Sequence, residues 1–120
     1  MVQKKYKLGK KEKDGLHRII ALRDFGSVKK GDVGGFVESE NNLSQKGNAW
    51  VYGNALVFGD AQVSGDALVF GDAKVYGKIK LKKGLLCSRF DFKFKWQIDL
   101  WFKMEKEFEK AAKNEVESDA

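Results

Sequence analysis

The central part of the chain repeats one pattern of apolar and polar positions every six residues. Residues 51–77 read VYGNALVFGDAQVSGDALVFGDAKVYG, which is four hexads and the start of a fifth. Each hexad has Val first, Gly third, Asn or Asp fourth and Ala fifth. Self-similarity at a fixed period indicates a repeat architecture. Alternating Ala and Val predict a short strand with both side chains on one face, and Gly-Asn or Gly-Asp predicts a sharp corner.

These repeats resemble the hexapeptide repeat of left-handed β-helices, in which three hexads form one triangular coil. The resemblance implies that the Ala and Val columns fill a narrow interior, and that residues three hexads apart stack on the same outer face. The stacked pairs would be Trp50 and Tyr52 with Leu68 and Phe70, Leu56 and Phe58 with Lys74 and Tyr76, and Gln62 and Ser64 with Lys80 and Lys82. Allowing for a two-residue insertion near Gln45-Lys46, Phe36 joins the second face and Asn42 the third.

Two of the three outer faces are therefore expected to be apolar, and one polar. Covering six large side chains of the apolar faces would gain ~9–18 kcal/mol gross, so they are normally covered by the rest of the chain, another subunit or a partner. The flanking segments and a subunit interface both remain open as the cover. The expected partner or oligomer surface comprises Trp50, Tyr52, Leu56, Phe58, Leu68, Phe70, Tyr76, Trp96, Trp101 and Phe108.

The segments on either side of the repeats have different patterns. Residues 1–30 are expected to cap the first coil, with a hairpin of 4–8 and 16–22 around the turn signal Asp14-Gly15, and residues 31–82 to form the β-helix. The lysines of residues 2–13 indicate a solvated turn or a frayed end, with phosphate contacts as the alternative.

Residues 89–100, RFDFKFKWQIDL, alternate without a fault between apolar and polar positions. This alternation predicts a long amphipathic strand within 85–100, with its aromatic side on an apolar wall or on a second subunit. Asp99 is expected to cap a helix over 100–115, with Trp101, Met104, Phe108 and Ala111 along one side. The expected fold is therefore mainly β: a short left-handed β-helix with an N-terminal hairpin cap, a long C-terminal strand and a C-terminal helix.

The stretch LRDFGSVKKGDVGGFVESENNLSQKGNAWVYGNA resembles the leader that precedes G-[ND]-A-x-V-x repeats in small proteins of bacteriophages and prophages. The resemblance covers about residues 16–77. It implies a hexapeptide-repeat protein in a phage context, and it assigns no activity.

The composition is that of one globular domain of 120 residues with a net charge of +6. The charge is uneven: residues 1–36 carry +6, 37–77 carry −3, 78–102 carry +5 and 103–120 carry −2. No apolar run is long enough to span a bilayer, and no apolar signal core follows the basic N-terminus, so we expect a cytoplasmic protein of a bacterial host with no membrane association. The single cysteine, Cys87, excludes an internal disulfide and is expected to be a small buried hydrophobe.

Catalytic groups are sparse in this sequence. The resemblance to left-handed β-helices brings in the acyltransferases of that fold, which generally use a histidine as general base. The one histidine, His17, lies in the expected cap strand, where a structural hydrogen bond is its simplest role. One histidine also cannot supply a zinc site of several histidines. We therefore expect no enzymatic activity, no cofactor and no metal.

A binding function is the remaining hypothesis. The first version is a homo-oligomer, dimer or trimer, that binds and inhibits a host protein or nucleoprotein such as a component of an anti-phage defence system, CRISPR–Cas among them. Alternatives are a protein that binds nucleic acid or a nucleotide signal, an acyltransferase-like protein and a structural or virion module. Possible contacts to nucleic acid or an acidic partner are Lys78, Lys80, Lys82, Lys83, Lys93 and Lys95. The nucleic-acid version is weakened because the strand prediction places the lysines and aromatics of 89–100 on opposite faces.

Overall fold

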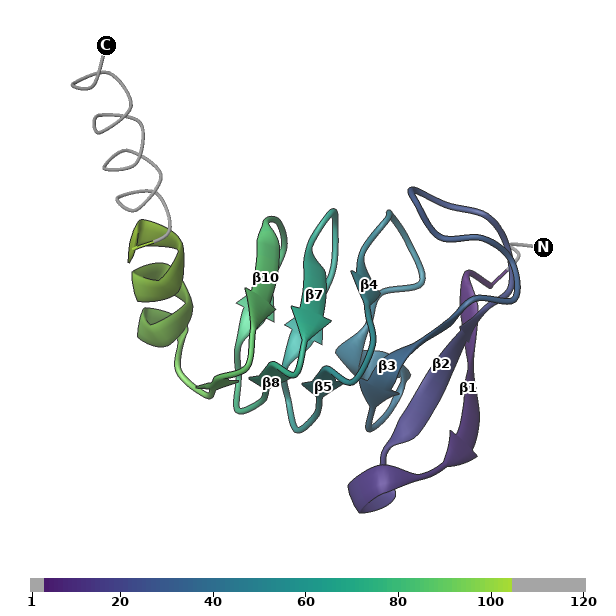
Figure 1. Ribbon diagram of the computed structural model, residues 1–120, viewed down its shortest axis with the longest axis horizontal. Coiled ribbons are helices and arrows are strands. Elements are labelled where there is room, and N and C mark those ends of the chain that lie inside the picture. Colours follow the sequence, from purple (N-terminus) through teal and green to yellow (C-terminus); the bar gives the residue numbers. More distant parts are fainter. Residues whose placement is uncertain (1–3, 105–120) are drawn as a thin grey trace, which may run out of the picture.

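Short strands stack on three sides of a β-solenoid, in agreement with the hexad pattern (Figure 1). This computed structural model describes residues 4–104. The first side is the sheet of β4 (Trp50–Val51), β7 (Leu68–Gly71) and β10 (Leu85–Ser88), whose strands are parallel. Trp50 pairs with Leu68, which pairs with Leu85, so the predicted stacking of Trp50 and Leu68 is confirmed.

The other two sides follow the same register. The second side contains β3 (Val33–Val37), β5 (Leu56–Val57), β8 (Lys74–Val75) and β11 (Asp91–Phe92). The third contains β6 (Gln62–Val63) and β9 (Lys80–Leu81). Phe36 pairs with Leu56, and Leu43 bridges to Val63, so the first coil is longer by two residues, as the insertion predicted.

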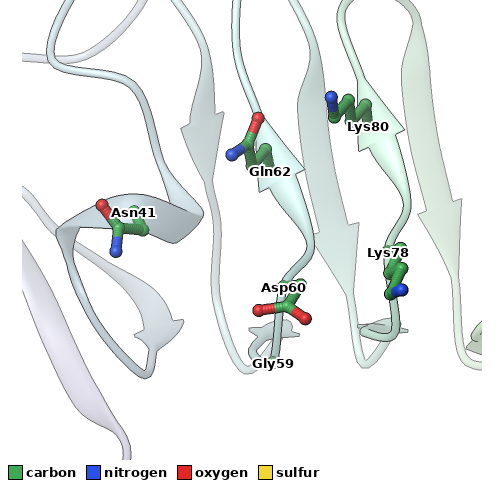
Figure 2. Close-up of a pocket in the computed structure, with 6 residues that line it drawn as sticks. All are labelled: Asn41, Gly59, Asp60, Gln62, Lys78 and Lys80. Carbon is green, nitrogen blue, oxygen red and sulfur yellow. The ribbon is translucent and has the colours of Figure 1, made fainter.

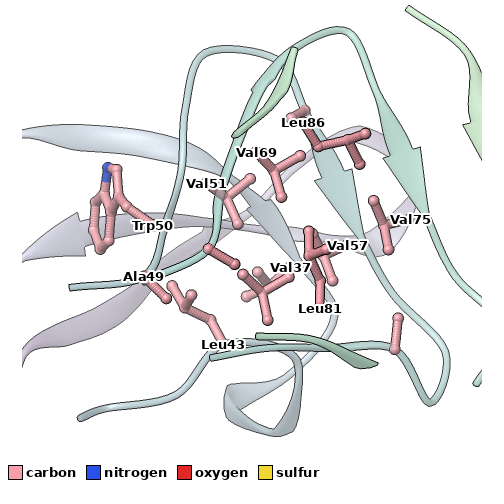
Figure 3. Packing of buried hydrophobic residues seen from close by; sticks show 14 of the residues in the cluster. Val37, Leu43, Ala49, Trp50, Val51, Val57, Val69, Val75, Leu81 and Leu86 are labelled. Atoms are coloured by element: carbon pink, nitrogen blue, oxygen red, sulfur yellow. The ribbon is translucent and has the colours of Figure 1, made fainter. Parts of the chain in front are cut away.

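The interior of the solenoid is made of the valine and alanine columns (Figure 3). Every repeat valine and alanine is fully buried: Val51, Val57, Val63, Val69 and Val75, with Ala49, Ala55, Ala61, Ala67 and Ala73. At the corners, the glycines adopt positive φ angles, such as 60° at Gly53 and 73° at Gly71. L-residues with a Cβ rarely adopt this conformation, which explains the Gly at each corner.

An N-terminal hairpin lies at the first coil, as predicted. β1 (Tyr6–Lys11) pairs antiparallel with β2 (His17–Ala21), and β2 pairs antiparallel with β3, so the hairpin extends the second side of the solenoid. The 3₁₀ turn η1 (Lys13–Gly15) joins the two strands, and Asp14 has a φ of 55° there. A second 3₁₀ turn, η2 (Glu40–Asn42), lies on the third side, where the buried Asn42 donates to the carbonyl oxygens of Gly59 and Ala61.

The prediction of a long amphipathic strand within residues 85–100 is wrong. Strand β11 covers only Asp91–Phe92, and residues 95–104 are helical; we call them the C-terminal helix. The helix therefore starts before Asp99, which is not its cap. Instead Gln97 Oε1 accepts hydrogen bonds from the backbone N–H groups of Lys93 and Phe94, at 2.7 and 2.9 Å. These bonds satisfy donors at the start of the helix.

In a helix that begins at residue 95, Ile98 and Phe102 are four residues apart and lie on one side. Both pack against the core at the end of the last coil, and Ile98 is 5% exposed. The helix thus lies at the opposite end of the solenoid from the hairpin (Figure 1). The predicted end of the helix, with Phe108 and Ala111, lies outside the described residues.

Two further expectations concern single residues. The expectation that Cys87 is buried is wrong: Cys87 is exposed, because the buried Leu86 beside it takes the inward position of β10. Lys5 is fully buried in the N-terminal segment that the sequence indicated as solvated. Among residues 4–104, no helix combines the length and apolar character needed to cross a membrane.

Candidate functional site

The first-coil members of the expected partner surface are covered by the chain itself. Trp50 is 1% exposed, and its ring lies edge-on to those of Phe25 and Tyr6, with centroids 5.2 and 6.1 Å away. Leu56 is 3% exposed and clusters with Leu16 and Phe36. These two predicted surface residues therefore belong to the folded interior, because the hairpin and the loop that follows it fold back over both apolar walls.

Further along the solenoid the walls form half-buried aromatic ladders. Tyr52 stacks on Phe70 with ring centroids 4.2 Å apart, and Phe58 stacks on Tyr76 at 4.9 Å. Leu68 is also half-buried and packs against the core. The parallel register accounts for the stacking, since equivalent side chains of successive coils lie directly above one another. The ladders cover much of their own apolar surface.

The largest exposed apolar side chains gather at the C-terminal end. We call this set the C-terminal apolar surface: Phe90, Phe94, Trp96, Leu100 and Met104, which are 46–61% exposed. Trp96, Leu100 and Met104 recur at every fourth position of the C-terminal helix, so they form one stripe along it. Phe94 stacks parallel to Trp96 with centroids 6.5 Å apart, which extends the stripe past the start of the helix.

Trp101 connects this surface to the core. It is half-buried, and its ring lies edge-on to Phe90 and Phe92 at 6.0 and 6.1 Å. Its indole Nε1 is buried without a hydrogen-bond partner among residues 4–104. Trp101 thus positions Phe90, whereas Trp96 is the predicted residue that the structure exposes most. Phe108 lies outside the described residues.

Between the last coil and the C-terminal helix lies an open cavity of about 510 Å³, which we call the lysine pocket. Its lining combines cationic and apolar side chains with one carboxylate: Lys78, Lys80, Lys82, Lys83, Lys95, Ile79, Leu81, Ile98, Phe102 and Asp99. Five of the six predicted contact lysines are therefore brought together. The sixth, Lys93, places its Nζ 5.5 Å from the centre of the Phe94 ring.

A second depression, of about 360 Å³, adjoins the lysine pocket on the third side of the solenoid (Figure 2). It is lined by Asn41, Gly59, Asp60, Gln62, Lys78 and Lys80, so it shares two lysines with the pocket. This side is the polar face that the repeat register predicted. The two cavities therefore meet at Lys78 and Lys80, beside β9.

The lysines and aromatics of residues 93–96 are not on opposite faces. The strand ends at Phe92 and the helix begins at 95, so Lys93 lies over Phe94 and Phe94 stacks with Trp96. The objection to nucleic-acid binding that rested on strand alternation is therefore wrong. Cations and aromatic rings are adjacent at this end of the molecule.

The side chain of His17 has the structural contact expected of it. Its Nδ1 donates to the carbonyl oxygen of Gly9, 3.0 Å away across the hairpin. In the part of the chain that the structure describes, no group of three or more His, Cys, Asp or Glu is placed to hold a metal ion.

Lys5 is a buried cation that the sequence did not reveal. Its Nζ donates to the carbonyl oxygens of Ala49 and Lys46 at 2.8 and 3.4 Å, and lies 5.0 Å from the centre of the Phe25 ring. Burial, with a smaller contribution from the charge of Arg23, lowers the pKa of Lys5 to about 8. Burial also raises the pKa of the neighbouring Tyr6, whose hydroxyl donates to the carbonyl oxygen of Leu43. Both side chains tie the hairpin to the first coil, so their role is structural.

The repeats and the three stacked sheets define a short β-solenoid of the hexapeptide-repeat type. No protein-family model matches the sequence. A stretch of 44 residues is 43% identical to a protein of Escherichia coli (strain K12) named "Uncharacterized acetyltransferase YdcK". The matched stretch is 37% of this chain and 14% of that protein. The similarity is compatible with a hexapeptide-repeat protein, and the chain spans only a small part of this relative.

Proposed function

We propose that this chain is a non-catalytic binding protein that forms a homodimer through its C-terminal apolar surface. The observation that carries the proposal is the concentration of exposed large apolar side chains at one end. Six such residues lie within residues 85–104, and Val33 is the one elsewhere among residues 4–104. Contiguous exposed apolar surface of this kind marks interaction sites.

The size of this surface suits self-association. Each of the five side chains is about half exposed, and a fully buried large apolar side chain gains roughly 1.5–3 kcal/mol, so covering all five gains about 4–8 kcal/mol gross per chain. In a two-fold dimer the same patch is buried on both chains, which doubles this gain to about 8–16 kcal/mol. Association costs about 4–15 kcal/mol, so a dimer of moderate affinity is expected.

A second copy is the occupant that we favour over other partners. A two-fold interface needs a self-complementary patch, and the stripe of Trp96, Leu100 and Met104 on a helix can pack against its own copy in the antiparallel direction. In the sequence, Phe108 continues the same four-residue spacing beyond the described residues. Within the described residues, the stripe from Trp96 to Met104 runs along about two turns of the helix.

The resemblance of the leader and repeats to phage and prophage proteins supports a host protein as the further partner. In this proposal the dimer acts in the cytoplasm of the bacterial host and blocks its target, for which a defence component such as CRISPR–Cas is a candidate. The half-buried ladders of Tyr52–Phe70 and Phe58–Tyr76 remain available on the sides of the solenoid. Affinity purification from host lysate followed by mass spectrometry tests this part, and the absence of any specific host protein would count against it.

Light scattering coupled to size-exclusion chromatography tests the dimer itself. Trp96→Glu places a charge in the centre of the stripe and is expected to yield a monomer. The matched control is Val33→Glu, since Val33 is 58% exposed and Trp96 61% exposed, but Val33 lies at the other end of the molecule. The control is expected to remain a dimer. If both variants and the wild type have the same mass, the C-terminal apolar surface is not the interface.

The similarity to a protein named as an acetyltransferase supports a second candidate, an acyl-transfer function. In that case His17 would act as the general base, and acetyl-CoA would raise the unfolding temperature of the wild type. His17→Ala would abolish that shift. We favour the non-catalytic proposal because His17 lines neither the lysine pocket nor the adjoining depression.

A further inference from the structure

The lysine pocket lies on a different side of the C-terminal helix from the apolar stripe. Lys95, Asp99 and Phe102 face the pocket, while Trp96, Leu100 and Met104 form the stripe. With 3.6 residues per turn, the mean directions of the two sets lie roughly 130° apart around the helix axis, with Asp99 and Trp96 the nearest pair at about 60°. A ligand in the pocket therefore leaves the proposed dimer contact free, and the two surfaces can be tested separately.

We propose that the lysine pocket binds a nucleotide, with its phosphates on the lysines and its base on the apolar floor. This inference goes beyond the proposed function, since dimer formation needs no ligand. It is carried by three features of the pocket: its charge, its apolar floor and its size.

The net positive charge of the pocket favours a ligand with several negative charges. The lining contains five lysines and one carboxylate, that of Asp99. Both ion pairs of residues 4–104 lie elsewhere: Lys4 with Glu40, and Arg18 with Glu12. Lys80 and Lys82 flank the inward Leu81, so their side chains leave the same face of the chain about 6.6 Å apart, and Lys78 lies in the corner that precedes β9. Such a row repels itself and attracts a chain of phosphates.

The floor of the pocket is apolar and contains an aromatic ring. Ile79, Leu81 and Ile98 are 3–5% exposed, and Phe102 is half-buried. The ring of Phe102 lies against Gly84, where an added Cβ would come within 2.9 Å of it. A simple phosphate would leave this floor uncovered, whereas a nucleobase offers a flat face for stacking on Phe102.

The dimensions fit the same ligand. The pocket has a volume of about 510 Å³, within the range of roughly 300–1,000 Å³ typical of small-molecule sites. The adjoining depression of about 360 Å³ shares Lys78 and Lys80 and continues across Gln62 of β6 to Asn41, with Asp60 as the one carboxylate of its lining, so a phosphate chain can extend along the third side away from the helix (Figure 2). A nucleoside triphosphate therefore suits the combined shape better than a monophosphate.

Isothermal titration calorimetry of the full chain with ATP, adenosine and tripolyphosphate tests the proposal. ATP is expected to bind, with an affinity that falls as salt is added. Tripolyphosphate is expected to bind about tenfold or more weakly than ATP, because it lacks the base, and adenosine to give no measurable heat. Equal affinities for ATP and tripolyphosphate, or no ATP binding at low salt, would overturn the proposal. A single-stranded oligonucleotide that bound far more tightly than ATP would overturn it in favour of a nucleic-acid track.

A pair of matched substitutions locates the site. Lys80→Gln removes one charge inside the pocket and is expected to weaken ATP binding about threefold to fivefold. Lys74→Gln removes one exposed charge from the second side of the solenoid and is expected to leave the affinity unchanged. Phe102→Leu is expected to bring the affinity for ATP close to that for tripolyphosphate. Equal losses in the two lysine variants, with unchanged unfolding temperatures, would show diffuse attraction by the whole surface and contradict a pocket.

Discussion

Alanine at two equivalent corners would test how closely successive coils approach each other. Gly53 and Gly71 follow the first side of the solenoid in successive coils, and their φ angles are 60° and 73°. A Cβ on Gly53 would lie 3.9 Å from the carbonyl oxygen of Gly71, an ordinary contact. A Cβ on Gly71 would lie 2.7 Å from the carbonyl oxygen of Ser88. That oxygen also accepts the 3.0 Å hydrogen bond from the backbone N–H of Asp72, so it cannot move away freely.

Both substitutions incur the cost of a positive φ angle, about 1–2 kcal/mol for an L-residue. Gly71→Ala adds an overpacking cost of about 1–3 kcal/mol. We therefore expect Gly53→Ala to lower the free energy of unfolding by about 1–2 kcal/mol and Gly71→Ala by about 2–5 kcal/mol. At about 4 °C per kcal/mol, the unfolding temperatures of the two variants should differ by about 4–12 °C.

Urea denaturation followed by far-ultraviolet circular dichroism measures both variants beside the wild type. The two glycines share conformation and repeat position, so the difference between the variants isolates the contact with Ser88. Equal destabilisation would show that the last coil does not approach Gly71 as described, and would refute the reasoning.

Two more predictions concern the core and the buried cation Lys5. Leu86→Ala should lower the free energy of unfolding by about 2–5 kcal/mol, because Leu86 is fully buried in the last coil. Leu85→Ala should change it by no more than about 0.5 kcal/mol, because Leu85 is 54% exposed. Similar urea midpoints for the two variants would contradict the alternation of buried and exposed side chains in β10. Burial lowers the pKa of Lys5 from 10.5 to about 8, so as the pH rises the folded chain loses this proton before the unfolded chain does. The free energy of unfolding should therefore increase as the pH rises from 8 to 10.5, by about 2 kcal/mol at pH 9.5. Lys5→Met should lack this rise and the exposed Lys4→Met should keep it; the same pH dependence in both variants would argue against a buried charge.

The repeat is the part of the fold that the sequence predicts best. Each hexad repeats its inward Val and Ala and its corner Gly, so one assignment of strand and turn is tested several times within the chain. The two-residue insertion near Gln45-Lys46 could also be located, because Phe36, before it, pairs with a residue twenty positions later, whereas Trp50, after it, pairs with one eighteen positions later. The hairpin was predictable from its turn residues, although the burial of Lys5 beneath it was not.

The candidate sites depended on tertiary contacts that no local pattern contains. Trp50 has the outward position of its repeat, and only the folding back of Tyr6 and Phe25 buries it. Residues 89–100 alternate as in a strand, but the contacts of Ile98 with the core together with the cap from Gln97 decide for the helix after Phe94. The lysine pocket exists because that helix lies beside β9. The individual lysines could be proposed from the sequence, but their common cavity could not.

The mass of the wild-type chain in solution tests the proposed dimer most directly. Sedimentation equilibrium over a hundredfold range of protein concentration would measure it without a column or a matrix. We expect the mass to approach twice the 13.6 kDa of one chain at the upper concentrations, and Trp96→Glu to remain at the mass of one chain throughout. A wild type that stays at 13.6 kDa over the whole range would contradict self-association through the C-terminal apolar surface.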